Sequence, residues 1–155
     1  MNLQPPPAGL ERLFRVDVLV GDIEDHGMTS AGHRRVVPIL GGRIIDGLDA
    51  EVLPGGADWQ LVRPDGTIEI DTRYSARTAD GALLHLRTHG IRAGAPAVLE
   101  ALSRGEDVPA TAYTFRLHVI VETSAPEHAE LQRALIVASA ARGPGQVVYD
   151  AYRLT

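Results

Sequence analysis

Alternation of apolar and polar residues is the feature that most constrains the fold of this chain. Between Tyr113 and Val121, aromatic and aliphatic residues occupy every second position, and the positions between them are mostly polar. Residues two apart in a β-strand share one face of a sheet, so this pattern predicts a strand with one apolar face. Segments 14–20 and 68–75 alternate in the same way. The chain is therefore predicted to consist mainly of antiparallel strands.

Turn signals separate the predicted strands at short intervals. Pro64-Asp65-Gly66 and Asp80-Gly81 each join two alternating segments, because proline presets φ and glycine accepts positive φ. Short helices are expected only within 94–107 and 125–135, and no alternating strand–helix rhythm is present. The predicted fold class is all-β, with one or two short helices. The expected architecture is an antiparallel up-and-down or near-closed β-barrel, lipocalin-like in general shape.

Length and charge narrow the domain organisation and the partners. The proline-rich residues 1–9 predict a disordered or extended lead-in, and residues 10–155 predict one β-barrel domain. A net charge of −5 argues against nucleic acid and against an anionic membrane surface as partners. Cysteine is absent, which excludes disulfides and thiolate chemistry. The first residues lack the pattern of a signal peptide and the apolar runs are short, so a cytoplasmic location is expected.

Several short motifs carry a resemblance to a known family. They are Gly41-Gly42, the segment Leu53–Trp59 (LPGGADW), Asp65-Gly66, Asp80-Gly81, Gly90, and the segment Val148–Tyr152. Together they resemble the domain of unknown function 3237 family over most of the chain after about residue 10. The family tends to carry an aromatic-Leu-Asn triplet where this chain has Glu130-Leu131-Gln132. The resemblance implies a closed or nearly closed antiparallel β-barrel and implies little about chemistry.

In the central strands, every second position carries an aliphatic or aromatic residue (the aliphatic parity) and many of the positions between carry charged residues (the charged parity). The charged parity has two interpretations. In an open sheet it is a solvated face, and in a barrel it is either the outer wall or a polar lumen. Arg116 and Glu122 attract attention because they share one parity of a strand otherwise rich in apolar residues. The segment around Asp58 and Trp59 also has two interpretations. Its glycines suit either a ligand-facing barrel mouth or a structural corner.

The sequence lacks the motifs of most known kinds of catalytic site. His85 and His89 are four residues apart, and on a strand that separation is about 13 Å, too far to share one metal ion. No nucleophilic serine motif or phosphate-binding loop is present, and no cofactor or metal is expected. Acid–base catalysis by side chains is the kind of chemistry that these absences leave possible. The residues predicted to be catalytic are Asp58, Arg116 and Glu122, and those predicted to bind substrate are Trp59, Arg73, Tyr74, His89 and Tyr152.

The sequence therefore supports two functions. The first is a cofactor-free enzyme, an isomerase, cyclase or lyase, that acts on a carbonyl-bearing, aromatic or polyketide-like small molecule. The alternative is a non-catalytic, lipocalin-like ligand-binding protein or a scaffold, in which the arginines and acids only form ion pairs between strands. A homo-oligomer, with a dimer favoured, is expected because any apolar parity that faces outward must be covered.

Overall fold

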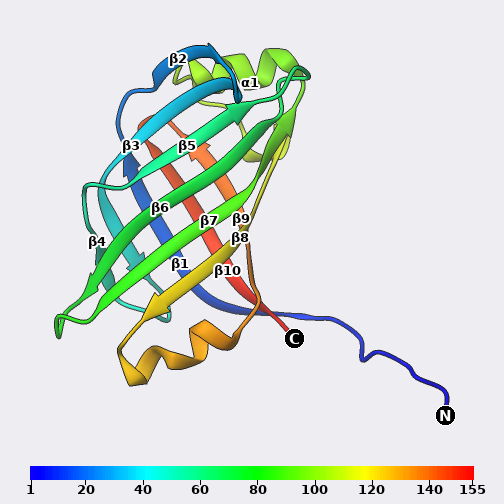
Figure 1. Cartoon of the computed structure of the whole chain (residues 1–155), viewed down its shortest axis with the longest axis vertical. Coiled ribbons are helices and arrows are strands. Elements are labelled where there is room, and N and C mark those ends of the chain that lie inside the picture. Colours follow the sequence, from blue (N-terminus) through cyan, green and yellow to red (C-terminus); the bar gives the residue numbers. More distant parts are fainter.

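The computed structural model describes all residues, 1–155, and forms a closed antiparallel β-barrel (Figure 1). The predicted all-β fold class is thus confirmed. The strands are β1 (Leu10–Val20), β2 (Glu24–Thr29), β3 (Gly32–Ile45), β4 (Ala50–Val52), β5 (Ala57–Val62), β6 (Ile68–Thr78), β7 (Leu83–Gly94), β8 (Tyr113–Thr123), β9 (Ile136–Gly143) and β10 (Gln146–Leu154).

The barrel closes because β1 pairs with β10 on one side and with β3 on the other. Strands β6 to β10 form an antiparallel meander in chain order. Between β3 and β6, the short strands β4 and β5 lie end to end, each paired with both neighbours. The circuit therefore has eight positions around the barrel. A barrel of this size has an interior just wide enough for side chains or one small ligand.

The aliphatic parity of the strands points into the barrel. Val16, Ile44, Leu86 and Ile136 are completely buried and come from four different strands. Because aromatic residues make up only 5% of the chain, aliphatic side chains supply most of this packing. The charged parity points outward, where it meets solvent and other charged side chains.

Three short helices accompany the barrel. Helix α1 (Pro96–Ser103) begins with proline, which suits the first turn of a helix, and it buries Leu99 and Leu102. It lies at the same end of the barrel as β2 (Figure 1). The two others are 3-10 helices, η1 (Ala110–Ala112) and η2 (Pro126–Arg133). None of the helices is long and apolar enough to cross a lipid bilayer. Residues 1–9 precede β1, have no regular structure and are exposed.

Glycines mark the places where one backbone passes close to another. A Cβ atom at Gly56, in the corner between β4 and β5, would lie 2.3 Å from the carbonyl oxygen of Arg73. One at Gly42 would lie 2.0 Å from the carbonyl oxygen of Asp17. Gly56 of the LPGGADW segment is therefore a structural requirement of the corner, and Gly55 has a positive φ of 108° that favours glycine.

An ion-pair cluster on the outer wall joins β1 to β10. Arg15 donates two hydrogen bonds of 2.8 Å to Asp150, one to each carboxylate oxygen, and Arg12 donates a third at 2.8 Å. These contacts lower the pKa of Asp150 to about 2, mainly through the Arg15 hydrogen bonds. A lowered pKa means that the ionised carboxylate stabilises the folded state. That contribution is present above the ordinary pKa of 3.8 and is lost as the pH falls toward 2.

Replacing Asp150 by asparagine should lower the free energy of unfolding at pH 7 by about 1 kcal/mol, since the arginine partners are partly exposed and solvent screens the pairs. The difference from wild type should shrink below pH 4 and be mostly lost by pH 2, as measured by urea unfolding across pH. Asp49→Asn, which removes a more exposed ion pair, serves as the control. A deficit that stays constant from pH 7 to pH 2 would contradict the assignment.

Candidate functional site

A cavity occupies the interior of the barrel between the β5 and β10 walls. Sixteen residues line it, and ten of them are hydrophobic. Its free volume is about 40 Å³, which is room for only a few water molecules. Small-molecule sites usually measure about 300–1,000 Å³, so a ligand can enter this cavity only if lining side chains move apart, and a slim or flat ligand requires the least movement.

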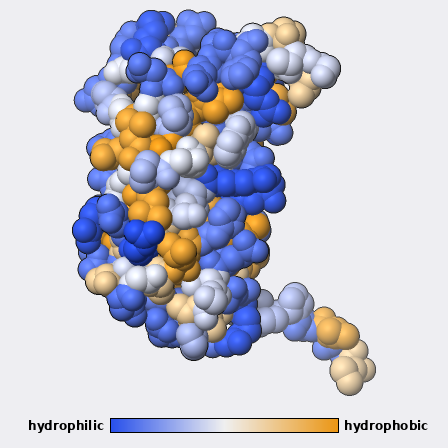
Figure 2. All heavy atoms as spheres, turned by 60° about the vertical axis from the view of Figure 1, so that its left-hand side comes forward, coloured by the Kyte–Doolittle hydropathy of each residue, from blue (hydrophilic) through white to orange (hydrophobic).

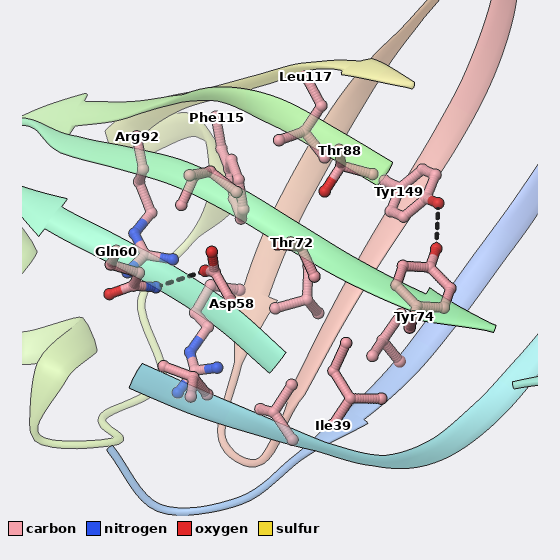
Figure 3. A pocket seen from close by; sticks show the side chains of 16 residues that line it. Ile39, Asp58, Gln60, Thr72, Tyr74, Thr88, Arg92, Phe115, Leu117 and Tyr149 are labelled. Atoms are coloured by element: carbon pink, nitrogen blue, oxygen red, sulfur yellow. Dashed lines mark hydrogen bonds between the residues drawn. The ribbon is translucent and has the colours of Figure 1, made fainter. Parts of the chain in front are cut away.

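A directional hydrogen-bond chain crosses one end of the cavity (Figure 3). Asp58 and Gln60 are two apart on β5, so both side chains point inward. Gln60 Nε2 donates to Asp58 Oδ2 at 2.7 Å, and Arg35 Nη2 donates to Gln60 Oε1 at 3.0 Å. The backbone N–H of Asp71 donates to Asp58 Oδ1 at 3.1 Å. The amide orientation of Gln60 is fixed from both sides, and the Asp58 carboxylate is held in place by two donors.

Burial makes Asp58 an unusually basic carboxylate. Loss of hydration raises its pKa above the ordinary 3.8, because the charged form is poorly solvated inside the barrel. Hydrogen bonds from Gln60 and from the Asp71 backbone oppose this rise. A carboxylate of raised pKa in an apolar cavity is suited to accept and return a proton.

Arginines surround the same end of the cavity. Only 3% of Arg92 is exposed, and its guanidinium lies over the Phe115 ring, 5.2 Å from the ring centroid. Burial lowers the pKa of Arg92 to about 10 and also lowers the pKa of Arg142. Both side chains line the cavity, and Arg35 lies beside them through its bond to Gln60. This end of the cavity therefore carries a concentration of positive charge.

Two tyrosines form a polar pair at the other end. Tyr74 on β6 and Tyr149 on β10 are both buried, and each hydroxyl is hydrogen-bonded to the other (Figure 3). Burial raises the pKa of both phenols, so both are neutral at physiological pH. One hydroxyl proton is used within the pair, and the second has no protein acceptor. That proton is available to a ligand in the cavity.

The structure brings two of the predicted site residues to the cavity, Asp58 and Tyr74. The other six lie on the outer wall of the barrel. Arg73 and His89 approach the partly exposed carboxylate of Asp71, at 3.7 and 3.8 Å. His89 also borders a shallow outer groove together with Arg116 and Tyr152. Trp59 and Glu122 are exposed as well, the latter 3.9 Å from His85.

Arg116 and Glu122 lie on the outer wall, so the charged parity does not line the interior of the barrel. The interpretation of a polar lumen formed by that parity is therefore corrected. The aliphatic parity fills the interior because burying it removes more apolar surface from water, and the charged parity forms contacts between strands on the outside. Arg116 and Glu122 follow the charged parity and are separated from Asp58 by the barrel wall.

The residues that sequence reasoning missed share one signal. Each except Gln60 is a polar residue on the apolar parity of its own strand; Gln60 shares its parity with Asp58, opposite Ala57, Trp59 and Leu61. Arg35 shares parity with Val37 and Ile39, and Thr72 shares parity with Ile70 and Tyr74. The complete missed set is Arg35, Gln60, Thr72, Thr88, Arg92, Arg142 and Tyr149.

No group of three or more His, Cys, Asp or Glu side chains is placed to hold a metal ion.

Comparison with known proteins gives consistent matches along the whole chain. The sequence matches the family described as "protein of unknown function (DUF3237)" over residues 8–154. A UPF0311 protein of Rhodopseudomonas palustris is 37% identical over 150 residues, which are 96% of this chain and 98% of that protein.

Two solved structures share the architecture. A β-barrel-like protein of Acinetobacter baumannii has a TM-score of 0.86 and 41% identity, covering 99% of this chain and all of that one. An enzyme from Penicillium herquei has a TM-score of 0.72 at 20% identity, with both chains covered in full. At that identity the second likeness concerns the fold alone.

Proposed function

The chain belongs to the DUF3237 family of proteins of unknown function, and we propose that its barrel is a cofactor-free acid–base enzyme. Its substrate would be a small carbonyl-bearing or aromatic molecule that enters the cavity. The observation that carries the proposal is the Asp58 carboxylate, which is held by two donors in a largely apolar cavity where burial raises its pKa. Of the predicted residues, the proposal uses only Asp58 and Tyr74.

The chemistry follows from the groups that face the cavity. Asp58 accepts a proton from a carbon next to a carbonyl, and the electron pair of the C–H bond moves into the carbonyl to give an enolate. The negative oxygen is stabilised by a guanidinium or by the free phenolic proton of the Tyr74–Tyr149 pair. Return of the proton to another carbon completes an isomerisation, and attack or departure of a group at the neighbouring carbon completes a cyclisation or an elimination.

The surroundings favour this step. The hydrophobic lining excludes water, so hydrogen bonds and charges inside the cavity act more strongly than in solution. A protein of the same fold, from Penicillium herquei, is an enzyme, which makes a barrel of this shape compatible with catalysis. Its low identity gives no residue roles for this chain.

The largely hydrophobic lining also supports the alternative, a lipocalin-like protein that binds its ligand without turnover. The two functions differ in one measurable respect. An enzyme of the proposed kind accelerates proton removal from carbon, whereas a binding protein returns its ligand unchanged.

The test uses 5-nitrobenzisoxazole, a flat probe whose C–H proton is removed by a base while its N–O bond breaks. The product, 2-cyano-4-nitrophenolate, is coloured. The wild-type protein should open the probe faster than acetate at equal carboxylate concentration. The rate should rise with pH to a plateau whose midpoint lies above 3.8, because Asp58 acts in its ionised form and burial raises its pKa.

Glu69→Gln provides the matched control, since it removes an exposed carboxylate on the outer wall of β6. It should leave the rate and the midpoint unchanged. A wild-type rate no greater than that of acetate, or a midpoint at or below 3.8, would count against Asp58 as the base.

The expected homo-oligomer and cytoplasmic location also remain proposals. Apolar side chains are exposed on the outer wall, among them Leu10, Leu19 and Leu40, with exposed fractions of 61%, 48% and 58%. Figure 2 shows apolar patches interspersed with hydrophilic residues on one side of the barrel. Patches of this kind are consistent with a second copy of the chain as the partner.

A further inference from the structure

The positive charge in the cavity exceeds what the protein itself neutralises. Two guanidinium groups, those of Arg92 and Arg142, line one end, where Asp58 is the only carboxylate that lines the cavity, and a third, that of Arg35, lies behind Gln60. They come from β3, β7 and β9, so three separate strands converge on this point. One further negative charge could be accommodated there without an excess of acid.

Arg92 is the clearest case of an unpaired charge. It is 3% exposed, it makes no hydrogen bond or ion pair with another side chain, and its Nε is buried without an acceptor. Its one specific contact in the protein is the face of the Phe115 ring. Burying a guanidinium without an anionic partner is costly, and proteins tolerate it mainly where function requires the charge.

The neighbouring arginines, Arg35 and Arg142, also lack an anionic hydrogen-bond partner. Arg35 donates to two neutral oxygens, Ser103 Oγ and Gln60 Oε1, both at 3.0 Å, and its Nε is also buried without an acceptor. The guanidinium of Arg142 has no hydrogen-bond partner, although its backbone N–H is bonded to the Tyr113 hydroxyl at 2.7 Å. The available donors therefore point to a ligand that supplies acceptor oxygens.

From this convergence of unpaired guanidinium groups we propose that the cavity binds an organic anion, a carboxylate or phenolate with a flat or slim apolar body. The anionic head lies between Arg92 and Arg142, with Arg35 adding positive charge from behind Gln60, and the body extends along the aliphatic lining toward the Tyr74–Tyr149 pair (Figure 3). Arginine suits such a head because its planar fork donates two parallel hydrogen bonds to one carboxylate. This inference rests on the proposed function and names the substrate class of the same cavity.

The test compares benzoate with benzamide, which has nearly the same shape but no charge, by isothermal titration calorimetry. Wild type should bind benzoate at least about tenfold more tightly than benzamide, since hydrogen bonds between charged groups are stronger than those to a neutral amide. Arg92→Gln should weaken benzoate binding at least about tenfold and leave benzamide nearly unchanged. Arg77→Gln, which removes an exposed arginine on the outer wall of β6, should change neither affinity.

Thermal stability separates a binding role from a structural one. Without ligand, the Arg92→Gln variant should have a melting temperature at least equal to that of wild type, because a buried unpaired charge has been removed. If that variant does not fold, Arg142→Gln provides the same binding comparison with a less buried side chain. Equal affinity for benzoate and benzamide in wild type, no binding of benzoate, or full benzoate affinity in both variants would overturn the proposal.

The two proposals fail in different ways. If benzoate binds through Arg92 but the protein does not open 5-nitrobenzisoxazole, the cavity is an anion-binding site and the acid–base proposal is lost. If Asp58-dependent opening of the probe is found while benzoate has no advantage over benzamide, the enzyme proposal stands and the anionic substrate class is wrong.

Discussion

Replacing Asp58 by asparagine should slow the opening of 5-nitrobenzisoxazole by about 10²–10⁴-fold, the usual contribution of a general base. Asparagine has nearly the same size and shape but cannot accept a proton from carbon. Its effect on the reaction should therefore far exceed its effect on the fold. The measurement is kcat/KM for the probe at a pH on the plateau of the wild-type profile, with Glu69→Gln assayed in parallel.

The hydrogen-bond chain limits how well asparagine can replace the carboxylate. Its Oδ1 can still accept from the Asp71 backbone N–H, but its Nδ2 then faces Gln60 Nε2, which is also a donor. Gln60 cannot turn without presenting its own donors to Arg35. The loss of about one hydrogen bond, roughly 1 kcal/mol, opposes the gain from removing a buried charge. The melting temperature should consequently change by only a few degrees.

Chemical rescue distinguishes a base from a structural residue. In the Asp58→Ala variant, added formate should restore part of the rate, because a small carboxylate can occupy the space that the side chain leaves. Formate should have no such effect on wild type. A fully active Asp58→Asn variant would end the assignment of Asp58 as the base.

The fold was predictable because strand periodicity and turn chemistry agree along the chain. The alternation in β6 and β8 determines that these segments are half-buried strands, and Pro64-Asp65-Gly66 determines where two of them join. The family resemblance then favoured closure of the sheet, which alternation alone does not specify. Closure depends on β1 pairing with both β3 and β10, contacts between residues far apart in the sequence.

The site was harder to predict because alternation identifies two faces without stating which of them faces inward. The charged parity carried most of the reactive groups, so it drew residues such as Arg116 and Glu122 into the predicted site. An interior of eight strands is filled mainly by the aliphatic parity, and only rare polar residues on that parity face a ligand. Arg92 and Thr72 meet that criterion. Asp58 and Gln60 do not, because on β5 the apolar residues Ala57, Trp59 and Leu61 occupy the opposite face.

Replacing Gly90 by alanine should destabilise the whole barrel. Gly90 lies on β7 beside β8, and a Cβ atom there would lie 1.9 Å from the carbonyl oxygen of Arg116 and 2.9 Å from Cα of Leu117. Both atoms belong to the backbone of β8, so no side chain can move aside to relieve the contact. Overpacking of this kind costs about 1–3 kcal/mol, and a rigid backbone contact should place the effect at or above the upper end. The melting temperature should fall by about 6–12 °C.

Gly143→Ala is the matched control, because the nearest atom to a Cβ there is the flexible Gln146 side chain at 3.5 Å. Its melting temperature should stay within about 2 °C of wild type. Gly90 is two residues from Arg92 on β7, so any shift that relieves the contact also displaces that guanidinium. The Gly90→Ala variant should therefore lose benzoate affinity even at temperatures where it remains folded. Wild-type stability in this variant would mean that β7 and β8 are farther apart in solution than the structure places them.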